Sequence, residues 1–280
     1  RPKSAKLNSM RKPAEILFLI LAVFLGSIGV SASGDIEKAV AAYKLGDYET
    51  ALSELKPLAE QGYADSQGFL GWMYQNGLGV PKDYKIAMEW YTLAAEQGYA
   101  NAQFNLGQMY HEGQGVPQDH MTALTWYELA AEQGNADAEF NLGNLYRKGQ
   151  AVPRNYETAV KWYTRAAERG SVSAQMNLGL MYQNGLGVLR DHKVAVKWYR
   201  LAAEQGHPKS QTNLGAMYAF GRGVQRDYVY AHMWGNIAAN NGNDLGAKLR
   251  DDFEKKMTAT DISVARQLAR ECVRKVYKDC

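Results

Sequence analysis

The side chains that most often carry out chemistry are few in this chain and do not cluster along it. The five histidines are widely spaced, and no His-Glu-x-x-His motif sets two of them on one helix face. Two of them occupy a position that is tyrosine in sister segments, at the start of a helix. The pattern predicts neither a metal site nor a cofactor. The histidines are His111, His120, His192, His207 and His232.

One short motif matches the start of a penicillin-recognising set. Ser53 and Lys56 form a Ser-x-x-Lys sequence, but the partner motifs Ser-Asp-Asn and Lys-Thr-Gly are missing. The motif also lies in an ordinary amphipathic helix. We therefore expect a chance match, no catalytic residue and no enzyme activity. An enzyme of cell-wall or β-lactam chemistry is the competing class.

Both cysteines, Cys272 and Cys280, lie near the end of the chain. Eight residues of straight helix would separate their Cα atoms by about 12 Å, whereas a disulfide tolerates about 4.4–6.8 Å. An intramolecular bridge therefore requires the helix to end before Cys280 and the tail to fold back. Two unpaired thiols, or pairing between chains, are the alternatives.

The elements that position all these residues follow one pattern with a period of 36 residues. Each copy has a glycine, a tyrosine three residues later, a glycine-rich turn and a helix rich in alanine and aromatic residues. A period of this length is typical of a solenoid, whose units share one continuous core. The anchor glycines are Gly71, Gly107, Gly143, Gly179 and Gly215. The units span residues 64–99, 100–135, 136–171, 172–207 and 208–243.

The second copy shows why each unit should be a helix pair. Apolar residues from Ala102 to Tyr110 recur with helical spacing, and Gly113 is a suitable left-handed end to that helix. Asp119 is a good N-cap for the next helix. Gly107 lies inside the first helix, where glycine costs roughly 1 kcal/mol against alanine. It therefore indicates a close approach between helices. The sequence predicts an all-α solenoid of about five helix-turn-helix repeats.

The ends of a solenoid must differ from its middle, because a terminal unit lacks a neighbour on one side. Residues 33–63 are expected to form an N-terminal capping helix pair, and residues 244–280 C-terminal capping helices. Residues 1–32 have the pattern of a signal peptide: Arg11 and Lys12, an apolar run over residues 16–30, and small residues up to Ala32. Met10 is a plausible start, which makes residues 1–9 non-native. An uncleaved anchor is the alternative, although the run falls short of about 20 residues.

Charge is concentrated in that N-terminal segment. Removing its five basic groups and one acidic group from the totals of 32 and 29 leaves 27 and 28. The remaining chain is nearly neutral, which argues against nucleic-acid binding. We expect an exported monomer, in the periplasm or outside the cell. Membrane contact is expected only through an uncleaved signal or a membrane-protein partner.

The motifs Leu-Gly-x-x-Tyr, Gly-x-Gly-Val, Trp-Tyr and Ala-Ala-Glu-x-Gly at this period resemble the Sel-one-like repeat (SLR) family, related to the tetratricopeptide repeat. Ala151 and Gly235 are small departures from the pattern. The resemblance implies a right-handed α-α superhelix that acts as an adaptor between proteins. A cysteine-rich branch of the family has been linked to β-lactam hydrolysis, but its paired cysteines in each repeat are missing here.

In that geometry the first helices line the concave face, where we expect a protein or peptide partner to bind. Three rows of side chains lie opposite the buried stripe. The alternative is that neighbouring first helices bury them. The candidates are Phe104, Phe140 and Met176 in one row; Trp72, Gln108, Asn144 and Leu180 in the next; and His111 and Arg147 in the third.

A fourth row carries asparagine in four successive units. A carboxamide both donates and accepts, so this row could hold the backbone of an extended partner. Alternatively, each side chain satisfies backbone groups of an adjacent turn. These residues are Asn105, Asn141, Asn177 and Asn213.

Overall fold

The structure is a computed structural model that describes residues 29–280. Every regular element of these residues is an α-helix, which confirms the predicted all-α solenoid class. None of the described helices is long and apolar enough to cross a membrane. Residues 1–28 of the predicted signal segment lie outside the described residues. The described helices divide between two compact units, residues 29–93 and 94–280.

The first unit contains the predicted opening helix pair and the start of the first repeat. Its core is a cluster of small and aliphatic side chains from three helices, including Ala51, Leu55 and Leu70. The Tyr43 ring meets the Phe69 ring edge-on, with centroids 5.0 Å apart. Its helices are α2 (Gly29–Lys44), α3 (Tyr48–Glu60), α4 (Ala64–Asn76) and the greater part of α5 (Tyr84–Glu96).

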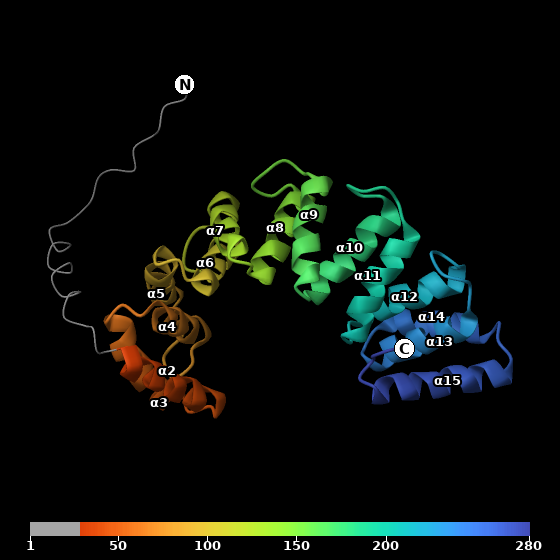
Figure 1. The fold of residues 1–280 in the computed structure, drawn as a ribbon, viewed down its shortest axis with the longest axis horizontal. Helices are drawn as coiled ribbons and strands as arrows, with labels where there is room; N and C mark the ends of the chain where they lie inside the picture. The colour runs from red at the N-terminus through yellow and green to blue at the C-terminus, as the bar shows by residue number, and fades with distance from the viewer. Residues whose placement is uncertain (1–28) are drawn as a thin grey trace, which may run out of the picture. The chain divides into compact units, whose positions relative to one another are not determined.

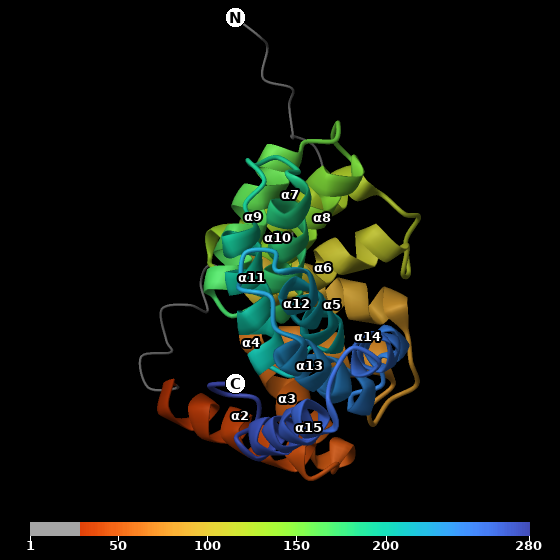
Figure 2. The same cartoon turned by 90° about the vertical axis from the view of Figure 1, so that its right-hand side faces the viewer.

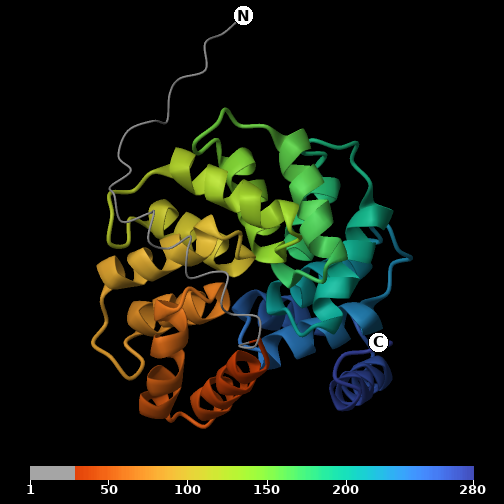
Figure 3. The same ribbon diagram turned by 60° about the vertical axis from the view of Figure 1, so that its left-hand side comes forward.

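The second unit holds the remaining repeats, whose helices follow one another in chain order (Figures 1 and 3). Each helix from α7 to α13 packs against the helix before it and the helix after it. Contacts between chain neighbours are the defining property of a solenoid. The helices are α6 (Ala100–Glu112), α7 (His120–Glu132), α8 (Ala136–Lys148), α9 (Tyr156–Glu168), α10 (Val172–Asn184), α11 (His192–Glu204), α12 (Pro208–Phe220), α13 (Tyr228–Asn240), α14 (Asp244–Glu254) and α15 (Ala259–Arg274).

Helix ends follow the predicted turn chemistry. Gly113 ends α6 in the left-handed conformation, with φ 72°, and the Asp119 carboxylate accepts hydrogen bonds from the backbone N–H groups of Met121 and Thr122. Asp83, Asn155, Asp191 and Asp227 cap their helices in the same way. Ala151, which replaces a turn glycine, still adopts φ 68°. The repeat therefore imposes a backbone that alanine disfavours.

The anchor glycine of each of the first four helix pairs lies against the ring of a buried tyrosine. A Cβ atom built on Gly143 would stand 2.6 Å from two ring carbons of Tyr163. Gly71, Gly107 and Gly179 face Tyr91, Tyr127 and Tyr199 in the same way. The last repeat has glycine, Gly235, in place of this tyrosine, and there Gly215 faces Leu249 of α14 instead. The glycine thus makes room for a ring, and the expected close approach is between a helix backbone and a side chain.

Buried glutamines join successive repeats. The Gln103 and Gln175 amides each donate to a backbone carbonyl at the end of the preceding helix, at 3.2 Å in both cases. Their carbonyl oxygens accept in turn from Gln133 and Gln205, at 2.8 and 2.9 Å. The amide nitrogen and the carbonyl oxygen of both buried glutamine side chains therefore have hydrogen-bond partners.

The third repeat carries a carboxylate at that position. Glu139 has no exposed surface, and its Oε1 lies 2.9 Å from Nε of Arg165. Arg169 approaches the other oxygen at 3.3 Å. Arg165 also donates to the carbonyl of Ala131, the bond that a glutamine amide makes elsewhere. Two arginines thus replace the glutamine network of the sister repeats.

The C-terminal helices close the second unit on the exposed side of the last repeat. Helix α14 packs on α12 and α13, and α15 packs along α13 (Figures 1 and 2). A disulfide joins Cys272 to Cys280, with Cα atoms 5.4 Å apart. As that bridge requires, α15 ends at Arg274 and the tail turns back. Tyr277 of the tail donates a hydrogen bond to Asn241, at 3.2 Å.

Candidate interaction surface

The first predicted row consists of half-buried apolar side chains that rest on the buried tyrosines. The Phe104 ring centroid lies 5.9 Å from that of Tyr127, and the Phe140 centroid lies 5.8 Å from that of Tyr163. Met176 is half-buried at the corresponding position of the next repeat. One side of each group packs on the core, and the other side stays accessible to a ligand.

The second row is chemically mixed. Trp72 is 40% exposed, and its indole N–H donates to the hydroxyl of Tyr43 at 3.2 Å. Gln108 bonds to Glu112 of its own helix at 3.0 Å. Leu180 is half-buried against a core cluster that its own repeat shares with the following one. This row offers an amphipathic aromatic group and aliphatic surface.

Two residues of the predicted surface form hydrogen bonds with a buried hydroxyl. Tyr163 donates to Asn144 Oδ1 at 2.8 Å and accepts from Arg147 Nε at 3.0 Å. Burial raises the pKa of Tyr163, and the Arg147 charge and hydrogen bond oppose that rise. Asn144 and Arg147 therefore satisfy the buried hydroxyl of Tyr163. Their positions in the sequence pattern did not reveal this structural role.

His111 is not isolated, because its ring lies against the ring of His120, with centroids 4.8 Å apart. Burial lowers the pKa of His111, and the charges of His120 and Lys148 lower it further. The described residues contain no group of three His, Cys, Asp or Glu side chains that could hold a metal ion. Sequence spacing did not reveal this histidine pair, which the turn between α6 and α7 brings together.

The asparagine row is half-buried along its described length. Asn141 and Asn177 lie beside the hydroxyls of Tyr127 and Tyr163, each belonging to the preceding repeat. This placement supports the structural alternative, in which the amides satisfy polar groups between repeats. Asn105 and Asn213 occupy the same position of their own helices.

The Ser-x-x-Lys motif lies on helix α3 with ordinary helical contacts. The Ser53 hydroxyl donates to the backbone carbonyl of Thr50 at 2.9 Å. Lys56 is exposed. Nothing in these contacts activates the hydroxyl as a nucleophile.

A cavity of about 550 Å³ lies between α13 and α15, outside every predicted row. Its residues were missed because α15 departs from the repeat period, so the sequence pattern did not place it on α13. One signal was available: the glutamate of the Ala-Ala-Glu-x-Gly motif is replaced by Asn240 in the last repeat alone.

The 36-residue repeat, the helix pairs and the glycine–tyrosine contacts assign the protein to the α-solenoid class of repeat proteins. The Sel1 repeat model matches residues 64–99, 100–135, 136–171, 172–207 and 208–243. The chain therefore belongs to the Sel1 repeat family. Sel1 repeat proteins generally serve as scaffolds for protein interactions.

Several solved structures are similar to this chain. A Sel1 repeat protein from Oxalobacter formigenes is 34% identical, with 88% of this chain and 97% of that chain covered and a TM-score of 0.73. A protective antigen of uropathogenic Escherichia coli with an SLR fold is 31% identical over 94% and 73% of the two chains, at a TM-score of 0.38. The immunity protein PA5088 of Pseudomonas aeruginosa is 20% identical over 80% and 86%, at 0.50, which shows the fold alone. The comparison with curated proteins gives no match.

Proposed function

We propose that this protein is an exported scaffold that binds a segment of a partner protein along the first helices of its repeats. One observation carries the proposal. Phe104, Phe140 and Met176 each keep part of an apolar side chain accessible, at the same position of three successive repeats.

Three equivalent apolar positions on successive repeats suit an extended segment, which can run along the row from one repeat to the next. An extended chain advances about 3.3 Å per residue, so residues several positions apart in a bound segment would meet successive apolar positions. The polar groups between these positions would hold the backbone of the segment.

The test compares two triple variants that lose similar apolar area. Phe104→Ala/Phe140→Ala/Met176→Ala alters the first helices, and Met121→Ala/Leu129→Ala/Leu201→Ala alters exposed positions of the second helices. Both proteins are immobilised and exposed to bacterial envelope extract. We expect one partner to bind wild type and the second-helix variant, and to be lost from the first-helix variant. Equal retention by both variants contradicts the proposal.

Export is supported by the N-terminal sequence, with its basic pair, apolar run and small residues ending at Ala32. Expression of the full chain followed by cell fractionation and N-terminal sequencing tests this part. We expect the protein in the periplasm or medium, beginning at Ser33. Recovery from the cytoplasm with the segment intact contradicts export and leaves the binding proposal standing.

A further inference from the structure

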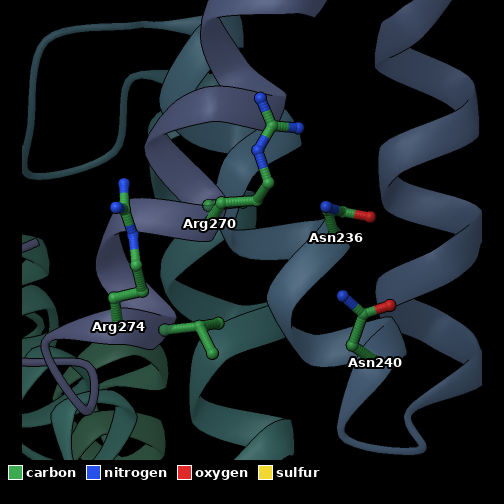
Figure 4. A pocket seen from close by; sticks show the side chains of 6 residues that line it. Asn236, Asn240, Arg270 and Arg274 are labelled. Carbon is green, nitrogen blue, oxygen red and sulfur yellow. The ribbon is translucent and has the colours of Figure 1, made fainter.

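The cavity between α13 and α15 is lined by four polar and two aliphatic residues. Figure 4 shows the two labelled arginines on α15 and the two labelled asparagines on α13. Both arginine side chains extend toward the same side of the view. The cavity is lined by Asn236, Asn240, Ala269, Arg270, Val273 and Arg274.

The two arginines are available to a ligand. Arg270 and Arg274 are four residues apart on α15, so they are neighbours on one helix face. Neither forms an ion pair with another residue of the range 29–280. The nearby carboxylates are occupied: Glu254 pairs with Arg266 at 2.9 Å, and Glu271 accepts from Gln267 at 2.8 Å.

The repeat itself provides a comparison for the opposite wall. The position of Asn240 is occupied by Glu96, Glu132, Glu168 and Glu204 in the four preceding repeats. A glutamate at position 240 would place a carboxylate on the wall that faces the arginines. The last repeat therefore lacks this carboxylate on α13, the helix on which α15 packs.

We propose that this cleft binds carboxylate groups of an acidic peptide segment. Guanidinium groups match carboxylates with two parallel hydrogen bonds. Asn236 and Asn240 form no hydrogen bond to another described side chain, and their amides can both donate to and accept from a peptide backbone. Ala269 and Val273 provide apolar contact for the methylene groups of an acidic side chain.

The local charge favours the same ligand. Residues 266–278 contain five basic groups and one acid, Glu271, in a protein that is nearly neutral after residue 32. An inorganic anion would accept hydrogen bonds from the arginines and the amides, but it would leave the amide oxygens and the aliphatic side chains without a role. The site is separate from the first-helix surface, so it does not depend on the function proposed above.

Three labelled peptides test the ligand class by fluorescence anisotropy at low salt. The first has six glutamates, an acetylated N-terminus and an amidated C-terminus. The second replaces the glutamates by glutamine, and the third is the glutamine peptide with a free C-terminus. We expect the glutamate peptide to bind with an affinity that falls as salt rises. Binding of the third peptide at the same site identifies a chain end as a second carboxylate source. Equal binding of the amidated glutamine peptide overturns the proposal.

Variants locate the site. Arg270→Gln/Arg274→Gln should weaken binding of the glutamate peptide at least tenfold, since it removes two charge-assisted contacts. Asn240→Glu should weaken it several-fold by placing a competing acid in the cleft, and this residue is compatible with the fold in four sister repeats. Lys193→Gln/Lys197→Gln removes two exposed charges with the same spacing on α11 and is the control. Wild-type affinity in the arginine variant, or an equal loss in the control, refutes the assignment.

Discussion

At the scale of single residues, the first four repeats each fit a tyrosine ring against a glycine of the neighbouring helix. The contact explains why glycine occupies a helix interior, where alanine is favoured by roughly 1 kcal/mol. Tyr163 fills the space that a Cβ atom on Gly143 would need. The two residues therefore form one packing unit.

Replacing Gly143 with alanine should lower the free energy of unfolding by about 1–3 kcal/mol, because the added methyl group overpacks a fully buried ring. In a Tyr163→Ala background the same change should be neutral or stabilising, since alanine is the better helix former. Urea unfolding of the four proteins in this cycle measures the coupling. Equal effects of Gly143→Ala in both backgrounds would contradict the contact.

At the scale of helices, the sequence predicted the repeat helices well because their ends depend on local chemistry. A carboxylate or amide such as Asp119 or Asn155 satisfies the first N–H groups of its helix, and a glycine such as Gly113 permits the left-handed end. The same residue types recur every 36 positions, so one interpreted copy predicted the others.

The packing of the C-terminal helix could not be predicted, because it depends on tertiary contacts that the local sequence pattern does not encode. Val273 of the last helix is apolar yet 44% exposed, whereas Cys272 beside it is buried. The pattern predicted the closing helix, whereas its packing along α13 follows from tertiary contacts with Trp234 and Ile237. For the same reason the sequence did not predict the cavity lined by Arg270.

Helix α13 of the last repeat and the C-terminal helices α14 and α15 meet at a buried histidine. His232 of α13 lies 3.2 Å from Glu254 of α14, which also pairs with Arg266 of α15. Burial lowers the pKa of His232, and the hydrogen bond and charge of Glu254 oppose this, while Arg266 and Arg250 add to it. The His232 Nδ1 atom is buried with no hydrogen-bond partner among the described residues. Protonation there would bury an unsatisfied N–H group.

Acid should therefore loosen this cap. The pKa of His232 in the folded protein lies below the ordinary value of about 6.5, so the unfolded chain binds the proton first as the pH falls. The free energy of unfolding therefore rises with pH between the lowered pKa and the ordinary one. We expect wild type to lose more stability between pH 7 and 5.5 than His232→Gln, which keeps an amide donor for Glu254; linkage limits the difference to about 1 kcal/mol. Thermal unfolding at both pH values measures the difference. His111 and His207 titrate in both proteins, so parallel pH profiles would exclude His232 as the cause.

At the scale of the whole molecule, the middle of the second unit is held together by contacts between consecutive helices. Stability in such an array is close to a sum of terms for each repeat and each boundary. The boundary between the second and third repeats contains the buried Glu139 and its bonds from Arg165, which also holds Ala131. A defect at this boundary is therefore expected to act locally.

Arg165→Leu should destabilise this boundary by about 2–3 kcal/mol, because it removes one partner of the buried Glu139 carboxylate. This is less than for a fully buried ion pair, since Arg165 is 42% exposed and Arg169 still contacts Glu139. Hydrogen exchange should accelerate in α7, α8 and α9, while α13 and α15 keep their protection. The triple variant Glu139→Gln/Arg165→Leu/Arg169→Gln installs the residues of the second and fourth repeats, and it should restore protection. Exchange that accelerates evenly over residues 94–280 would contradict a boundary-by-boundary array, because it would mean that the unit unfolds only as a whole.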